Sequence, residues 1–292
     1  MSGILEGLDI RLPRSKISPG SPLPASPGYL PGRKHPRFKG VPHADLHKVV
    51  WAARWAGLAF LSDDLMDAGK EYSRINALKR AGRGDRASAI SQNLVNQHDP
   101  VELAHNRLSE ALKLTAGPRE FAQCIKLTDE WWDSHIHEEF QSLEQYLSVR
   151  RVNVGMHAYA LDIRLSDEQL FHPLMREVEG IVSDHVGLVN DYYSFPKERL
   201  SNSDDTNIIR LLMDSEGVTY KQAAEIVRKK VGEKEKEFIL AGEAVLRDPE
   251  LSRSVNVHRW LTSMPYILGG NIAFHQTSGR YKTNDMPMQA RI

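Results

Sequence analysis

Apolar residues recur every three or four positions along most of the chain from His43 onward, whereas the first 42 residues lack such a pattern. The longest stripes of this kind lie at 49–61, 101–114 and 223–240. A period near 3.6 residues is typical of amphipathic helices, and no convincing alternation of apolar and polar residues indicates a strand. The pattern therefore predicts an all-α domain.

Prolines crowd the N-terminal segment, where eight of the 15 prolines fall between Pro13 and Pro42. Because proline lacks a backbone N–H and fixes φ, we predict that residues 1–42 form an extended or disordered tail. Turn-forming sequences such as TAGPRE and RLSNSDDTN separate the helices that follow, up to about residue 281. We expect one domain over 43–292, of which the last ~10 residues form a flexible tail.

Three polar residues interrupt an apolar stripe in the sequence GLVNDYYSFPKER at 187–199. Asn190, Ser194 and Glu198 follow one another at a spacing of four, with Lys197 beside the last of them. Since a helix turns by about 100° per residue, all four side chains share one face. The stripe therefore presents an amide, a hydroxyl, a carboxylate and an ammonium group together.

A second polar cluster lies in FLSDDLMD at 60–67, where Asp63 and Asp67 are separated by four residues and Asp64 is a neighbour. Like charges at this spacing destabilise a helix by ~0.2–0.5 kcal/mol, so we expect a compensating partner. Carboxylate, amide and hydroxyl oxygens are ligands that Mg²⁺ accepts, whereas His or Cys would suit zinc. Either cluster alone has a simple alternative as a solvated helix face, but the two together favour a metal–diphosphate site.

The sequence HIHEE at 135–139 also contains groups that can bind a metal ion. His135 and His137 are two residues apart and would face different sides of a helix. We therefore predict that they lie on the surface.

The sequence resembles class I terpene synthases of the fungal and bacterial single-domain type over residues 44–281. DDLMD is similar to the aspartate-rich motif of that family, and NDYYSFPKE matches its NDxxSxxxE motif. SLEQYLSVRRVNVG at 142–155 resembles the helix that carries a diphosphate-sensing arginine and a helix-break glycine, here Gly155. GNIAFHQTSGRY at 270–281 resembles the C-terminal element that ends in an Arg-Tyr pair. The resemblance implies an α-helical bundle around a central cavity.

The resemblance also implies roles for individual residues. It implies three Mg²⁺ ions, two of them bridged by Asp63, with Asp67 as a further candidate ligand and with the third ion held by Asn190, Ser194 and Glu198. Residues that would donate hydrogen bonds to the diphosphate are Arg150, Lys197, Arg280 and Tyr281. Arg151 is an alternative to Arg150, which we prefer for its five-residue offset from Gly155. The aromatic side chains nominated for the cavity, for each of which ordinary core packing is an open alternative, are Trp55, Phe60, Trp260 and Phe274.

The function that this resemblance implies is that of a Mg²⁺-dependent terpene cyclase acting on a linear isoprenyl diphosphate. We favour farnesyl diphosphate because the domain is compact, while Ala52, Ala56 and Ala59 leave room for geranylgeranyl diphosphate. A catalytically silent helical homologue is an alternative, because the proline-rich tail stands where the family has one or two further helices. A chain-elongating trans-prenyltransferase is another, although it would need a second aspartate-rich motif in place of NDYYSFPKE.

Composition limits the binding partners and the cellular compartment that we expect for this protein. Lys and Arg together number 38, as do Asp and Glu, so no global charge recruits nucleic acid or anionic membrane. Cys124 is the only cysteine, which excludes an internal disulfide and fits a reducing compartment. With no secretory signal and no bilayer-spanning stretch apparent, we expect a cytoplasmic protein, either a monomer or a homodimer.

Overall fold

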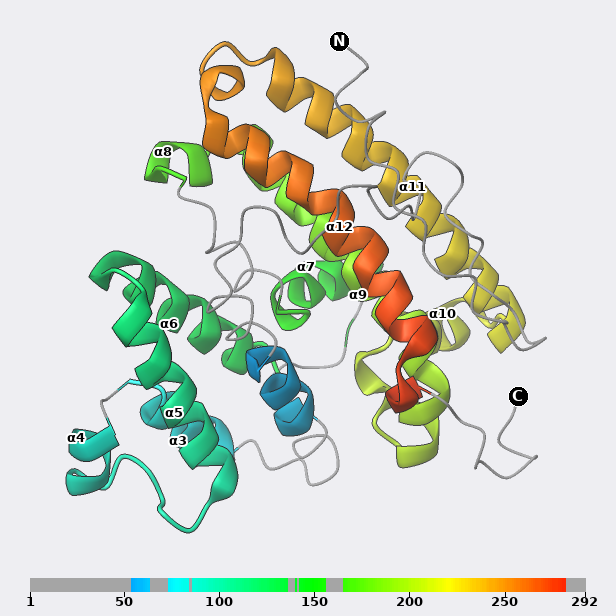
Figure 1. Cartoon of the computed structure of the whole chain (residues 1–292). Helices are drawn as coiled ribbons and strands as arrows, with labels where there is room; N and C mark the ends of the chain where they lie inside the picture. Colours follow the sequence, from blue (N-terminus) through cyan, green and yellow to red (C-terminus); the bar gives the residue numbers. More distant parts are fainter. Residues whose placement is uncertain are drawn as a thin grey trace. The chain divides into compact units, whose positions relative to one another are not determined.

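The computed structural model describes residues 54–63, 73–83, 86–135, 140, 142–155 and 165–281 (Figure 1). All regular structure in these ranges is helical, so the predicted all-α class is confirmed. The proline-rich tail at 1–42 and the predicted C-terminal tail after residue 281 lie outside the described residues, as does Asp67. The chain divides into two compact units, and each is described by itself.

One unit comprises residues 41–138 and 155–162. Its described helices are a helical segment at 54–63, α3 (Ser73–Ala81), α4 (Arg86–Ser91), α5 (Pro100–Thr115) and α6 (Pro118–Asp133). Helix α5 starts where the sequence provides a cap, because the Asp99 carboxylate accepts the N–H groups of Val101 and Glu102. The turn predicted at TAGPRE separates α5 from α6.

Tryptophans dominate the core of this unit. Trp55, Trp131 and Trp132 are buried together with Ile75 and Leu78 of α3. The ring centroids of Trp55 and Trp131 lie 5.4 Å apart, and those of Trp131 and Trp132 lie 4.4 Å apart. Large aromatic surfaces that pack in this way fix the helical segment 54–63, the last described residue of which is Asp63, against α3 and α6.

The other unit contains residues 139–154 and the chain from 163 onward. Its helices are α7 (Leu143–Asn153), α8 (Asp167–Leu170), α9 (Pro173–Ser201), α10 (Ile208–Glu216), α11 (Tyr220–Arg247) and α12 (Val255–Thr277). Short 3₁₀ turns are η2 (Asp204–Thr206), η3 (Leu251–Arg253) and η4 (Gly279–Tyr281). Helix α7 ends before Gly155, whose φ of 71° is the left-handed conformation expected of a helix-break glycine.

Helix α9 is the central element of this second unit. Every residue from Ile181 to Val189 is buried, so this part of the helix has no solvent-facing side. Helices α7, α10, α11 and α12 pack around it, and α11 and α12 run along its length (Figure 1). A buried central helix is a rigid support for the polar residues that follow at its C-terminal end.

Candidate active site

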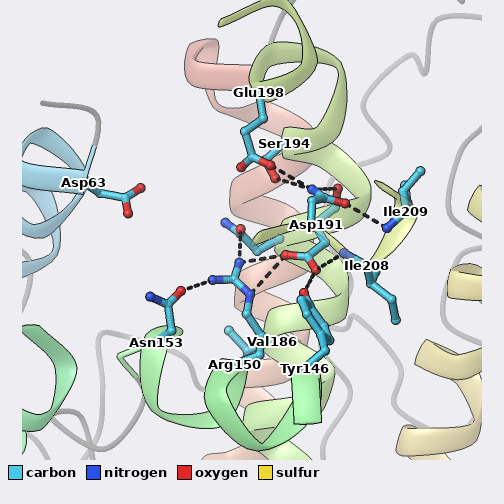
Figure 2. Close-up of polar contacts among 12 residues, drawn as sticks. Asp63, Tyr146, Arg150, Asn153, Val186, Asp191, Ser194, Glu198, Ile208 and Ile209 are labelled. Carbon is cyan, nitrogen blue, oxygen red and sulfur yellow. Dashed lines mark hydrogen bonds and ion pairs between the residues drawn. The ribbon is translucent and has the colours of Figure 1, made fainter. Parts of the chain in front are cut away.

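The polar cluster predicted from the sequence lies on the last three turns of α9 (Figure 2). Ser194 is buried, while Asn190 and Glu198 are half-buried. The helix continues past Pro196 to Ser201, so the four-residue spacing does place all three side chains on successive turns of one helix. This end of α9 therefore carries an amide, a hydroxyl and a carboxylate in sequence.

Arg150 reaches this cluster from α7 and binds two consecutive residues of α9. Its Nε and one terminal nitrogen lie 3.1 and 2.7 Å from Oδ1 of Asp191, and the same terminal nitrogen donates to Oδ1 of Asn190 at 2.6 Å. Gly187 leaves room for this approach, because a Cβ at that position would lie only 3.0 Å from Cγ of Arg150, closer than ordinary van der Waals contact. Arg150 is thereby fixed beside the polar end of α9 (Figure 2).

Asp191 is the anchor of this arrangement and is fully buried. Its Oδ2 accepts hydrogen bonds from the hydroxyl of Tyr146 and, at 3.0 Å, from the backbone N–H of Ile208. Burial raises the pKa of the Asp191 carboxyl, the negative charge of Glu198 raises it further, and the Ile208 N–H lowers it. The guanidinium of Arg150, 2.7 Å from Oδ1, favours the ionised form of this buried carboxyl. Through Arg150, Tyr146 and Ile208, Asp191 connects α9 with α7 and α10.

Replacing Tyr146 by Phe removes one donor from the buried Asp191 carboxylate and leaves the ring in place. We expect the free energy of unfolding to fall by about 1.5–3 kcal/mol, the usual range for a hydrogen bond to a charged group. Urea denaturation of Tyr146→Phe and of the wild type measures this difference. Tyr220→Phe on α11, where the half-buried ring stacks on Phe195, is the matched control, and an equal loss there would contradict the role given to Tyr146.

The orientation of the Asn190 amide follows from its other neighbours. Its Nδ2 lies 3.1 Å from Nε2 of His275 and 3.3 Å from the Tyr281 hydroxyl. The pKa of His275 is lowered to about 4, mainly by burial; the bond to Asn271 O opposes this change, and the positive charges of Arg150 and Arg280 add to it. A neutral His275 that donates from Nδ1 to that carbonyl accepts at Nε2, so the Asn190 amide nitrogen faces His275 and its oxygen faces Arg150.

Asn207 is a site residue that the sequence reasoning missed. It is buried at the N-terminus of α10, and its Nδ2 lies 2.8 Å from Oε2 of Glu198 and 3.4 Å from Oγ of Ser194. Its sequence signal, a polar residue between a turn and the apolar run IIRLL, predicts only a helix N-cap. The structure adds that this cap contacts two members of the α9 cluster.

The other predicted diphosphate-binding residues differ in their surroundings. Arg151 makes a two-pronged ion pair with Asp184, at 2.7 and 2.9 Å, rather than contacting the α9 cluster as its neighbour Arg150 does. The guanidinium of Arg280 lies 5.9 Å from the centre of the Tyr281 ring. Lys197 is half-buried on α9. Arg150 and Tyr281, two members of the predicted set, both contact Asn190.

In the other unit, Asp63 lies beside a histidine that we expected on the surface. His135 is buried, with Nδ1 2.9 Å from Trp131 O and Nε2 3.4 Å from Oδ1 of Asp63. The surface prediction for His135 is wrong because α6 ends at Asp133, and the following turn folds the imidazole against the edge of Trp131. His137 lies outside the described residues.

The four aromatic residues nominated for a cavity lie in different surroundings. Trp55 is part of the tryptophan-rich core described above, and Trp260 is buried on α12. Phe60 is half-buried, and Phe274 is 41% exposed with its ring edge-on to His275 and Tyr281. Their role in shaping a substrate cavity stays a prediction.

The α9 cluster has the donor set of a hard-cation site rather than of a zinc site. Among the residues described, no three His, Cys, Asp or Glu side chains gather as they would around a metal ion. Asn190, Ser194 and Glu198 instead offer one amide, one hydroxyl and one carboxylate oxygen. Divalent cations such as Mg²⁺ accept these donors and keep several positions for water or phosphate oxygens, so the residues present fit such an ion.

The helical architecture and this oxygen-rich cluster define the class of protein, a class I terpene synthase. A family model described as terpene synthase family 2, C-terminal metal binding, matches residues 54–237, which is more than half of the chain. The chain belongs to this family and is a terpene synthase, an enzyme of the lyase class that acts on prenyl diphosphates. Membership of a metal-binding family implies that it binds a divalent metal ion.

Individual relatives are distant but extend over most of the chain. A (3S,6E)-nerolidol synthase from Selaginella moellendorffii is 24% identical over 269 residues, which cover 85% of this chain and 70% of that protein. A 7-epi-alpha-eudesmol synthase from Streptomyces viridochromogenes, described as cyclising (2E,6E)-farnesyl diphosphate, is 24% identical over 273 residues, or 82% of this chain and 76% of that protein.

A solved structure supports the fold. The 2-methylisoborneol synthase of Streptomyces coelicolor A3(2), in complex with Mg²⁺ and 2-fluorogeranyl diphosphate, gives a TM-score of 0.71 at 17% identity and covers 82% of this chain and 81% of that one. The predicted terpene synthase type of helical fold is therefore confirmed. Within the described part of the chain, no helix combines the length and the apolar character needed to cross a bilayer.

Proposed function

We propose that this protein is a Mg²⁺-dependent terpene cyclase that ionises a linear isoprenyl diphosphate and cyclises the resulting carbocation to a hydrocarbon or an alcohol, with release of diphosphate. Farnesyl diphosphate is the proposed substrate and geranylgeranyl diphosphate the longer alternative. The relative from Streptomyces viridochromogenes, whose description specifies farnesyl diphosphate, supports the fifteen-carbon choice. We expect the enzyme to act in the cytosol as a monomer or a homodimer.

The observation that carries the proposal is the fixed geometry at the end of α9. Asn190 is held by Arg150 and His275, while Ser194 and Glu198 are held by Asn207. Ligands that are already ordered bind an ion with less loss of side-chain entropy. We propose that these three α9 residues bind one ion and that Asp63 and Asp67 provide ligands for two others.

The protein's own residues then have distinct tasks. When bound, Mg²⁺ supplies Lewis-acid stabilisation of the negative charge on the departing diphosphate. Arg150 and Arg280 present forked guanidinium groups suited to phosphate oxygens, and Lys197 and Tyr281 offer single donors. The apolar side chains around the reacting chain would exclude water from the carbocation.

Incubation of the purified protein with farnesyl diphosphate and Mg²⁺ is expected to give a terpene product detectable by gas chromatography. Chelation of the metal with EDTA is expected to abolish that product, and an excess of Mg²⁺ to restore it, because diphosphate departure depends on the ion. Geranylgeranyl diphosphate in a parallel reaction tests the longer substrate. If neither substrate gives a Mg²⁺-dependent product, the catalytically silent alternative replaces the proposal.

A further inference from the structure

Asn207 connects the start of α10 with the polar face of α9 through a single side chain. Its Oδ1 accepts the backbone N–H of Ile209 at 3.0 Å, which is the usual arrangement of an N-cap. This bond fixes the orientation of the amide, because the oxygen has to face that N–H. The two N–H groups of Nδ2 are therefore directed toward α9.

Three oxygen atoms of α9 lie within reach of those two donors. The shortest contact is to Oε2 of Glu198 at 2.8 Å, followed by the backbone oxygen of Asp191 at 3.1 Å and Oγ of Ser194 at 3.4 Å. The two N–H groups of Nδ2 thus serve three acceptors, of which the Glu198 carboxylate is the nearest. Asn207 thus contacts two of the three α9 oxygens assigned to the ion.

The position of Asn207 is determined by more than its own bonds. Its side chain is buried, with 1% of its surface exposed, and the adjacent Ile208 N–H donates to Oδ2 of Asp191. Ile208 and Ile209 are themselves buried in the core of this unit. The amide has little freedom to move away, so the orientation that it imposes on Glu198 is persistent.

The chemistry of the donor is suited to a metal ligand. An arginine or lysine in this place would orient the Glu198 carboxylate but would also neutralise its charge and compete with a cation. A neutral amide donates a hydrogen bond and leaves the negative charge available. Neutral or hydrogen-bonding partners that orient ligands in this way commonly contribute 10- to 100-fold to metal affinity.

We propose that Asn207 is a positioning residue of the metal site, which orders Ser194 and Glu198 for ion binding through its amide N–H groups. The inference rests on the proposed function, since it takes the α9 oxygens as ligands. Asn207 itself contacts neither substrate nor ion and acts through these two side chains.

Asn207→Ser separates the two roles of the residue, because serine is an equally good N-cap but its hydroxyl is too short to reach Glu198. Asn207→Thr, which fills more of the vacated space, serves as the second variant. Thr219→Ala is the matched control. Thr219 caps the next helix, α11, by accepting the N–H of Gln222, so this substitution removes a helix cap outside the α9 cluster.

The measurement is the melting temperature as a function of Mg²⁺ concentration at saturating inorganic diphosphate, together with kcat as a function of Mg²⁺ for the product-forming reaction. For both Asn207 variants we expect the half-saturating Mg²⁺ concentration to rise by about 10- to 100-fold in both assays. Thr219→Ala should lower the melting temperature and leave the Mg²⁺ dependence unchanged.

The outcomes separate this inference from the proposed function. If Mg²⁺ and diphosphate stabilise the wild type and the Asn207 variants respond at the same Mg²⁺ concentration, Asn207 has only a capping role and the inference is overturned. If the folded wild type shows no stabilisation and no product, the proposed function fails and the inference fails with it. A shift shared by Thr219→Ala would show a general loss of stability and would also overturn the inference.

Discussion

Glu198→Gln is expected to lower turnover by about 100-fold or more and to raise the Mg²⁺ concentration needed for activity, because it removes the one charged ligand of the α9 cluster. The change is nearly isosteric. The glutamine carbonyl can still accept the N–H of Asn207, so the start of α10 retains its contact with α9. Product formation over a range of Mg²⁺ concentrations measures the effect.

Glu243→Gln on α11 is the matched control for this experiment. Glu243 is an exposed carboxylate paired with Arg247 one turn later, away from the α9 cluster. This variant should keep the turnover of the wild type and its Mg²⁺ dependence. Wild-type turnover in Glu198→Gln would refute the assignment of Glu198 as a ligand.

Arg150→Ala is expected to lower the free energy of unfolding by about 3–5 kcal/mol, the range found when one partner of a buried ion pair is removed. The side chains of Arg150 and Asp191 are only 11% and 1% exposed, so the remaining carboxylate would be left without its charged partner. Urea denaturation followed by circular dichroism measures the loss. Activity should fall as well, because Asn190 loses the group that holds its oxygen.

The adjacent arginine provides the control. Arg151→Ala removes a side chain that is 46% exposed, and its buried partner Asp184 keeps Lys234 at 3.3 Å. We expect a loss of about 1 kcal/mol or less. Adding Asp191→Asn to Arg150→Ala should recover part of the stability, since the uncompensated charge is then gone. Equal losses at the two arginines would contradict the special role of the Arg150 pair.

The parts of the molecule that depend on local geometry were predictable from the sequence. The 3.6-residue period predicted an all-α chain, and turn-forming sequences marked real boundaries, such as the end of α9 at Ser201 within RLSNSDDTN. The common face of Asn190, Ser194 and Glu198 follows from helix geometry alone. These features require no knowledge of which helices become neighbours.

The partners of that face could not be predicted, because they come from elsewhere in the chain. Tyr146 and Asp191 are 45 residues apart in sequence, and Asn207 reaches α9 only after the turn η2 reverses the chain. His135 was predicted to be exposed but is buried, because its burial depends on where α6 ends. Single-sequence reasoning identifies a polar face but cannot identify the side chains that fold against it.

Gly187 on α9 is a position at which the placement of Arg150 can be engineered. The absence of a side chain there lets the Arg150 side chain pass close to α9, since a Cβ at residue 187 would lie 3.0 Å from Cγ of Arg150. Alanine at residue 187 would therefore place one methyl group against the Arg150 side chain. Substitution at this position offers a graded way to displace the arginine relative to its partners while every charged group of the site remains in the sequence.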